Sequence, residues 1–229
     1  MPMFTEICRM QILVVSATES EIRDLRDKFP EQEILVTGVG TPQTIFQLCK
    51  RFSQSDYQAV IQVGIAGGFK ESLANGEVVA VYRDRFADLG IVEKDQIEDL
   101  VEKGLASSAH SPFSAGWLEN KSSLIEKIAL KKVSAVTVNL VGNTPELTRM
   151  ISEKYNAEIE TMEGAAFHFA CTEYKQPFLQ LRAISNTVGE RDKSRWKIKE
   201  AIENLNRELL HVIQQLKTGS VVNEAYNDH

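Results

Sequence analysis

The chain has 229 residues, of which 43% are hydrophobic and 25% are charged, close to the averages of soluble folded proteins. Its apolar runs, such as residues 11–15, have the length of a strand and fall far short of the roughly 20 residues that a membrane-spanning helix needs. The net charge of −6 argues against a nucleic acid or an anionic membrane as partner, because both attract basic surfaces. The first residues do not resemble a secretory signal, so we expect a cytoplasmic protein that acts on a small molecule.

Cysteine and histidine usage bears on metals and redox chemistry. Cys8, Cys49 and Cys171 are far apart and odd in number, and their spacing fits neither a disulfide framework nor a zinc site. The four histidines are scattered as well. The sequence therefore predicts no metal and no cofactor.

Strand and helix patterns alternate along the chain. Segments rich in Val and Ile predict strands at residues 11–17, 33–37, 59–63, 77–82, 133–138 and 178–184. Apolar residues at helical spacing predict helices at residues 19–29, 43–52 and 196–216. This alternation favours an α/β fold around a largely parallel sheet, which carries its binding groups at the carboxyl ends of the strands.

The domain organisation is expected to be simple. Neither an internal repeat nor a long flexible linker divides residues 1–229, which favours a single domain. Residues 1–10 are expected to form an N-terminal extension, and the polar tail of residues 218–229 is expected to be mobile. Residues 84–120 fit the alternation poorly and are a candidate active-site loop or partner contact.

Four segments combine a strand end or helix start with residues that could carry chemistry. Each also has a purely structural explanation, because acidic residues in a first helical turn favour the helix dipole and Gly-rich turns need no ligand. A Glu carboxylate can, however, accept hydrogen bonds from sugar hydroxyls. The segments are the acidic helix start 15–21, the Gly-rich turn 64–68, the acidic segment 160–166 that opens an apolar helix, and the strand end 182–186.

In their order and spacing, the four segments resemble the nucleoside phosphorylase/nucleosidase superfamily across nearly the whole chain. Within that superfamily, the resemblance is to the hydrolytic branch of methylthioadenosine/S-adenosylhomocysteine nucleosidases and, more closely, to the futalosine hydrolases of menaquinone biosynthesis. It implies a three-layer α/β/α sandwich around a mixed, largely parallel twisted sheet, with a purine nucleoside as substrate. It also implies a homodimer or a higher homo-oligomer.

The resemblance assigns roles around the sugar. Glu21 matches the acidic residue that activates the attacking water, and Arg182 matches an arginine that helps to organise this water. Glu163 matches the carboxylate that binds the ribose, and Met162 packs beside the sugar. The chemistry would therefore rest on Glu21 and Glu163.

Asn186 points to the leaving base. By resemblance, it stands where the adenosine-type nucleosidases carry Asp, and Ser185 supports it. A purine leaves more easily when its N7 edge is hydrogen-bonded, because electron density flows into the ring as the glycosidic bond breaks. An Asn amide can donate to O6 of a 6-oxopurine and accept from N7–H, whereas a carboxylate pairs poorly with O6. Asn186 thus favours hypoxanthine, which is the base of futalosine.

Other positions depart from the family pattern. Ile65 stands where the adenosine-type nucleosidases have Ser near the water, so positioning of the water falls to Glu21, Arg182 and backbone groups, or the substrate lies differently. Residues 138–141 occupy a stretch that usually supplies an aromatic to the purine face. The remaining expected substrate contacts are Gly67 of the Gly-rich turn, Asn139, Leu140 and Val141.

Three functions remain open at this point: hydrolysis of a purine nucleoside, its phosphorolysis, and ligand binding without catalysis. A phosphorylase needs cationic groups around its phosphate, commonly Arg. The turn at residues 37–42 lacks Arg, and Glu21 would repel phosphate. Hydrolysis of a 6-oxopurine nucleoside such as futalosine is therefore the favoured interpretation, with a 6-aminopurine nucleosidase as an alternative.

Overall fold

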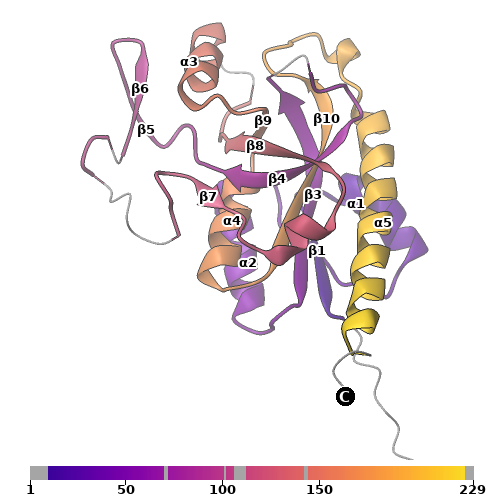
Figure 1. Ribbon diagram of the computed structural model, residues 1–229. Helices are drawn as coiled ribbons and strands as arrows, with labels where there is room; N and C mark the ends of the chain where they lie inside the picture. The colour runs from indigo at the N-terminus through magenta and orange to yellow at the C-terminus, as the bar shows by residue number, and fades with distance from the viewer. Residues whose placement is uncertain (1–9, 70–71, 101, 106–111, 142–143, 225–229) are drawn as a thin grey trace, which may run out of the picture.

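The structure is a computed structural model and describes residues 10–69, 72–100, 102–105, 112–141 and 144–224. An eight-stranded sheet forms its centre, and a separate two-stranded hairpin projects from it (Figure 1). The main sheet consists of β1 (Ile12–Ser16), β2 (Ile34–Val36), β3 (Ala59–Gly68), β4 (Val78–Asp84), β7 (Leu118–Glu119), β8 (Lys131–Thr137), β9 (Ile159–Thr161) and β10 (Phe178–Thr187). The hairpin consists of β5 (Gly90–Glu93) and β6 (Gln96–Asp99).

Helices cover both faces of the sheet. They are α1 (Glu19–Lys28), α2 (Thr41–Phe52), α3 (Pro145–Tyr155), α4 (Gly164–Glu173) and α5 (Ile198–Glu224), with short 3-10 helices at Ser123–Lys127 and Lys193–Arg195. Alternate residues of β1 face opposite cores, as a strand's period of two requires. Ile12 and Val14 pack with α1 and α5, whereas Leu13 and Val15 pack with α2 and α4. Figure 1 shows these helix pairs on opposite sides of the sheet, which confirms the predicted three-layer α/β/α arrangement.

Five strands of the main sheet close into a ring. Their order is β10, β4, β8, β9 and β3, and β3 pairs again with β10. The ring is mixed, because β10–β3, β4–β8 and β8–β9 are parallel pairs whereas β10–β4 and β3–β9 are antiparallel. Small and branched side chains from all five strands, among them Ala66, Val81, Ala135, Ile159 and Ile184, form one buried cluster. This closure brings the ends of β3, β9 and β10 together.

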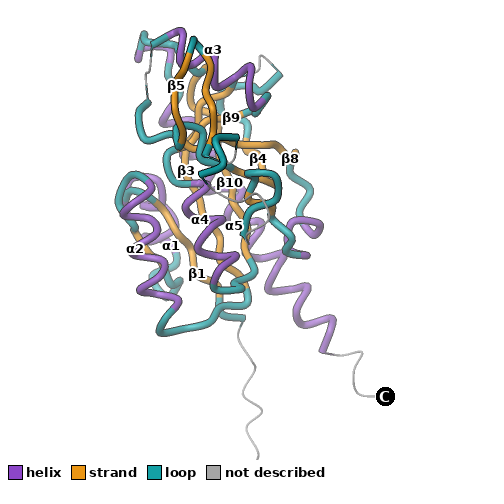
Figure 2. The backbone as a smooth tube through the Cα atoms, turned by 90° about the vertical axis from the view of Figure 1, so that its left-hand side faces the viewer, coloured by secondary structure: helices purple, strands orange, loops and turns teal. Residues whose placement is uncertain are grey.

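The hairpin and α3 form a further layer at one end of the molecule (Figure 2). Their buried residues, including Ile97, Ile151 and Tyr155, pack with Val136 of β8 and with Val138 directly after it. Neither element was predicted. The helix start of α3 nevertheless has a readable signal, since Thr144 caps it through Leu147 N–H and Pro145 stands at its first position.

Two expectations about elements need correction. Residues 160–166 do not open a helix as a block: β9 ends at Thr161, and α4 begins only at Gly164. At the C-terminus, α5 continues to Glu224, beyond its predicted end at residue 216, while the mobility of the tail stays a prediction. The expected N-terminal extension, apart from Met10, and residues 225–229 lie outside the described residues.

Candidate active site

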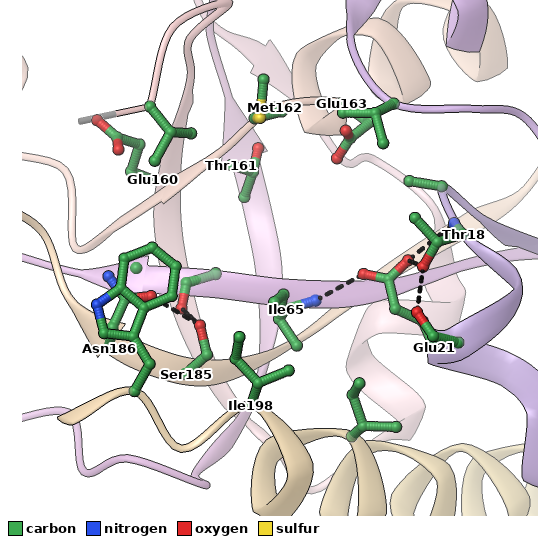
Figure 3. Close-up of a pocket in the computed structure, with 18 residues that line it drawn as sticks. Thr18, Glu21, Ile65, Glu160, Thr161, Met162, Glu163, Ser185, Asn186 and Ile198 are labelled. Atoms are coloured by element: carbon green, nitrogen blue, oxygen red, sulfur yellow. Dashed lines mark hydrogen bonds between the residues drawn. The ribbon is translucent and has the colours of Figure 1, made fainter. Parts of the chain in front are cut away.

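A pocket with a volume of about 380 Å³ opens beside the carboxyl ends of β1, β3 and β10. This is where ligands bind in α/β folds built on parallel strands, and the size suits a small organic molecule. Figure 3 shows Glu21 and Glu163 toward one end of the pocket and Glu160 and Asn186 toward the other. Its lining consists of Ala17, Thr18, Ser20, Glu21, Val39, Ile65, Ala66, Gly67, Val141, Glu160, Thr161, Met162, Glu163, Ser185, Asn186, Trp196, Ile198 and Ile202.

Four hydrogen-bond donors fix the Glu21 carboxylate. Oε2 accepts from Thr18 N–H at 3.0 Å, from the Thr18 hydroxyl at 2.9 Å and from the Ser16 hydroxyl at 3.0 Å. Oε1 accepts from the backbone N–H of Ile65 at 3.2 Å. Glu21 is the third residue of α1 and Thr18 its N-cap, so the bond from Thr18 N–H is also a helix-capping contact. The same carboxylate therefore caps a helix and lines the pocket.

Ile65 contributes through its backbone. Its N–H orients Glu21, while its side chain lines the pocket between the two ends (Figure 3). The neighbouring Gly64 is essential to this arrangement, because a Cβ there would overlap the Arg182 guanidinium and crowd Glu21 Oε1. Residues 64–68 were predicted as a Gly-rich turn, but they continue β3 to Gly68, and Gly64 is a point of close approach within the strand.

Glu163 lies at the N-terminus of α4 and faces the pocket from the opposite wall. Its Oε1 accepts from Gly40 N–H at 3.0 Å, and its Oε2 lies 3.7 Å from Arg182 Nη1. Burial raises the pKa of Glu163, against the opposing effects of Arg182 and the Gly40 N–H. Met162 precedes it in the lining.

Arg182 is beneath the pocket and does not line it. Its side chain is 2% exposed and donates from Nη2 to Gln62 Oε1 at 2.8 Å. Gln62 sits on β3, and sequence reasoning did not identify it. Arg182 therefore acts on the site through its contact with Glu163 and through its place beside Glu21.

A buried carboxyl group supports the floor of the site. Asp84 accepts from the Thr137 hydroxyl at 3.0 Å, from Gln180 Nε2 at 3.3 Å and from Arg85 N–H at 2.8 Å. Burial raises the pKa of Asp84 to about 7. A Cβ at Gly164 would overlap Asp84 and Gln180, so this polar cluster packs directly under the start of α4, next to Glu163.

A β-bulge presents Ser185 and Asn186 to the other end of the pocket. The register of β10 against β3 shifts between Ile184 and Asn186, and bulges commonly re-aim side chains beside active sites. The Ser185 hydroxyl donates to Asn186 Oδ1 at 2.7 Å, and Asn186 Nδ2 donates to Thr187 O at 3.0 Å. One amide hydrogen and one acceptor lone pair of Asn186 remain for a ligand.

The stretch after β8 differs from expectation. Val141 lines the pocket, but Asn139 and Leu140 do not, and the Leu140 side chain is 68% exposed. Asp88 holds Asn139 by accepting from its backbone N–H at 2.6 Å and from Nδ2 at 3.0 Å. Neither residue lines the pocket, so their contact with the substrate stays a prediction.

Several lining residues were not predicted. Trp196, Ile198 and Ile202 reach the pocket from the start of α5 and the turn before it. Their helical spacing indicates only an amphipathic helix, so nothing in the sequence separates them from core residues. Glu160 was not predicted as a site residue, because the nearby Glu163 belongs to a more recognisable motif.

The described lining is acidic. It contains Glu21, Glu160 and Glu163 and no Lys or Arg among the residues that the structure describes. Within the same residues, no cluster of three or more His, Cys, Asp or Glu is placed to hold a metal ion, and no helix is long and apolar enough to cross a membrane. The pocket therefore suits uncharged polar groups of a ligand, such as sugar hydroxyls, better than anionic groups.

Comparison with known proteins identifies relatives. The family model described as the phosphorylase superfamily matches residues 28–216. A futalosine hydrolase of Thermus thermophilus is 31% identical over 183 residues, which cover 79% of this chain and 80% of that protein. A 5′-methylthioadenosine/S-adenosylhomocysteine nucleosidase of Bacillus cereus is 26% identical over 206 residues, covering 79% of this chain and 87% of that protein.

Solved structures share the fold. A futalosine hydrolase of Helicobacter pylori superimposes with a TM-score of 0.76 at 16% identity, covering 90% of this chain and 98% of that one. A 5′-methylthioadenosine/S-adenosylhomocysteine nucleosidase of Colwellia psychrerythraea, solved in complex with adenine, has a TM-score of 0.75 at 20% identity and covers 91% of this chain and 96% of that one.

Proposed function

The chain belongs to the phosphorylase superfamily, and from that premise we propose that it is a purine-nucleoside hydrolase that releases hypoxanthine from futalosine. The observation that carries this proposal is the acidic pocket, in which a fixed Glu21 carboxylate faces the space where a nucleophile would lie. Futalosine hydrolases about 30% identical over most of the chain support the choice of substrate.

In the proposed reaction, water adds across the glycosidic bond. The bond between C1′ and N9 stretches first, so that the ribose gains oxocarbenium character, as in glycoside hydrolysis. Glu21 takes a proton from the water while the water oxygen forms its bond to C1′. This proton then reaches the departing base through solvent. The products are the free sugar, dehypoxanthine futalosine, and neutral hypoxanthine.

Glu163 and Asn186 would hold the two parts of the substrate. The Glu163 carboxylate accepts from the ribose hydroxyls, for which an ionised Glu is suited as a pure acceptor. Arg182 keeps this carboxylate in place through their 3.7 Å contact. At the other end, Asn186 donates its remaining amide hydrogen to O6 and accepts from N7–H, which stabilises the leaving base.

The same lining argues against phosphorolysis. Phosphate would carry its negative charge into a pocket that presents three carboxyl groups and, among the described lining residues, no cationic side chain. Phosphate sites in proteins usually combine such cations with backbone N–H groups. Water is the nucleophile that the site accommodates.

The test is base release from three nucleosides: futalosine, inosine and 5′-methylthioadenosine, each with and without phosphate. Chromatography of the free bases should show hypoxanthine from futalosine in the absence of phosphate. Release that requires phosphate would identify a phosphorylase. Preferred release of adenine would support the second candidate, a methylthioadenosine/S-adenosylhomocysteine nucleosidase, which the 26% identical relative favours.

We further propose that residues 1–229 act as one nucleosidase domain in the cytoplasm and assemble as a homodimer or higher homo-oligomer. The pocket draws on residues from Ala17 to Ile202, which supports a single functional unit. Val39 and Phe46 are 54% and 63% exposed beside the pocket and on α2, and exposed large apolar groups favour a protein contact. Light scattering after size-exclusion chromatography would give the oligomeric state; a monomeric mass would contradict this part.

A further inference from the structure

Glu160 and Asn186 face each other across a glycine. In the sheet, Gly67 pairs with Glu160 of β9 on one side and with Asn186 of β10 on the other. Residues that pair directly across strands point to the same face, so both side chains rise from one face of the sheet. Because neighbouring strands are about 4.8 Å apart, the two backbones stand roughly 10 Å from each other. Because Gly67 has no side chain, the space between Glu160 and Asn186 above this strand is open.

The width of this gap suits a flat ring. A Cβ at Gly67 would come within 2.8 Å of the Val188 side chain and 3.5 Å of Asn186 Nδ2, so any larger residue would intrude on the space beside Asn186. Figure 3 shows Glu160 and Asn186 above and below the same end of the pocket. A purine placed there would have one polar side chain at each of two edges.

Glu160 has no hydrogen-bond partner for its carboxyl group among the described residues, although it is only 8% exposed. Buried polar groups normally have partners, and one without a partner in a pocket is a candidate for binding a ligand. The other oxygen-bearing side chains nearby are engaged: the Ser185 hydroxyl donates to Asn186, and the Thr161 hydroxyl pairs with Thr137 and accepts from Gly164 N–H.

A 6-oxopurine has more polar edge atoms than Asn186 can serve. Asn186 can bind O6 and N7, which leaves the N1–H donor without an acceptor inside the pocket, a costly arrangement. We propose that Glu160 is a second base-reading residue, whose carboxylate accepts the N1–H of a 6-oxopurine while Asn186 binds O6 and N7. This inference rests on the proposed purine-nucleoside function and specifies how the same site chooses its base.

The protonation state of Glu160 bears on which base the site prefers. Burial and the negative charge of Asp88 raise the pKa of Glu160 to about 7. Ionised Glu160 accepts N1–H of a 6-oxopurine, whereas protonated Glu160 can donate to the bare N1 of a 6-aminopurine. The preference for inosine over adenosine should therefore increase between pH 6 and pH 8. Groups that contact only the sugar act alike on both nucleosides, so their effect cancels in the ratio of the two kcat/KM values.

The first experiment measures base binding and does not depend on turnover. Calorimetry would compare free hypoxanthine, which has N1–H, with unsubstituted purine, which has a bare N1. We expect Glu160→Leu to weaken hypoxanthine binding roughly 10- to 100-fold, the usual effect of an unpaired buried donor, and to leave purine binding unchanged or stronger. Glu160→Gln should retain part of the affinity, since its carbonyl still accepts. Glu173→Gln, on the exposed surface of α4, is the matched control.

The outcomes separate this inference from the proposed function. Equal losses for hypoxanthine and purine, or none for either, would overturn the role of Glu160. If wild-type protein releases no base from any nucleoside but Glu160→Leu selectively loses hypoxanthine, the hydrolase proposal fails and the base-reading role stands. Where turnover is present, the inosine-to-adenosine ratio of kcat/KM should rise with pH in the wild type and stay flat in Glu160→Gln; a flat wild-type ratio would contradict the ionised acceptor.

Discussion

Arg182 and Gly64 lie opposite each other in the parallel pairing of β10 and β3, and the Arg182 guanidinium occupies the space where any side chain at residue 64 would begin. Because Gly64 has no side chain, the guanidinium can lie beside the carboxylates of Glu21 and Glu163 at one end of the pocket. A Cβ at this point would crowd Glu21 Oε1, and Arg182 contacts Glu163 at 3.7 Å. Gly64 is therefore the position on which the spacing of these three charged groups depends.

Gly64→Ala should lower kcat/KM strongly and the unfolding temperature only modestly. The added methyl displaces Arg182 or Glu21, and a displacement of about 1 Å in a catalytic group can cost on the order of 100-fold in rate. Steady-state kinetics with futalosine and thermal unfolding of the same preparation would measure both effects. Glu173→Ala, on the exposed surface of α4, is the control for an added substitution away from the site. Unchanged kcat/KM in Gly64→Ala would contradict this role of Gly64.

Glu21→Gln tests the general base. Gln keeps the size of the side chain but cannot take a proton from water, so kcat should fall by roughly 100- to 10,000-fold. Substrate binding should change little, since Glu163 and the base-binding end are untouched. Single-turnover kinetics would report the chemical step, and calorimetry with a non-hydrolysable nucleoside analogue the affinity. A variant that keeps its wild-type kcat would assign the base role to another group.

Asn186→Asp tests the choice of base. A protonated Asp can donate to N7 and accept from a 6-amino group, which suits adenine, while a carboxylate opposes O6. The kcat/KM ratio should shift toward methylthioadenosine and away from futalosine, by several-fold at least and by up to a few powers of ten. Competition between the two nucleosides in one reaction gives this ratio directly. An unchanged preference would mean that Asn186 does not read the base.

Asp84→Asn tests the buried cluster under α4 through the pH dependence of stability. The pKa of Asp84 is about 7 when folded, against a model value of 3.8, so the folded state keeps a proton that the unfolded state loses. The stability from this group is present below about pH 4 and is lost as the pH rises to about 7, a decline on the order of 4 kcal/mol. The Asn variant should lack this decline.

Urea unfolding at pH 5 and pH 7.5 would measure the difference between wild type and Asp84→Asn. Comparison with the variant is needed because His168 acts in the opposite direction: burial lowers its pKa to about 4, so its contribution is lost as the pH falls from about 6.5. The variant should gain stability relative to wild type at the higher pH. The same difference at both pH values would show that Asp84 is ionised in the folded protein.

Periodicity predicted the parts of the fold in which one pattern runs for several turns or residues. The six predicted strands correspond to β1, β2, β3, β4, β8 and β10, and the three predicted helices to α1, α2 and α5. β9 was not predicted, because a strand of three residues is too short to show an alternating pattern. Its Glu160 and Thr161 also look like the polar start of the following helix. Closure into a ring was not predictable either, since the second pairing of β3 joins it to a strand more than 100 residues away.

The site could be predicted from the sequence where a polar or glycine residue stands at the end of a strand or the start of a helix. Glu21, Glu163, Ser185 and Asn186 all line the pocket, as do Ile65, Gly67, Met162 and Val141. Asn139 and Leu140 do not line the pocket, and Asn139 is instead hydrogen-bonded to Asp88, 51 residues earlier in the chain. Arg182 was identified, but its depth beneath the pocket depends on a glycine on the neighbouring strand, which a sequence pattern does not reveal.

β10 is the last strand of the chain, yet it lies between β3 and β4 and completes the ring. During synthesis, an edge of each of these two strands stays without its partner until residues 178–187 have left the ribosome. Exposed strand edges recruit strands from other molecules. The newly made protein is therefore most exposed to aggregation just before its last strand arrives, and a chain cut within β10 is expected to precipitate instead of giving a smaller enzyme.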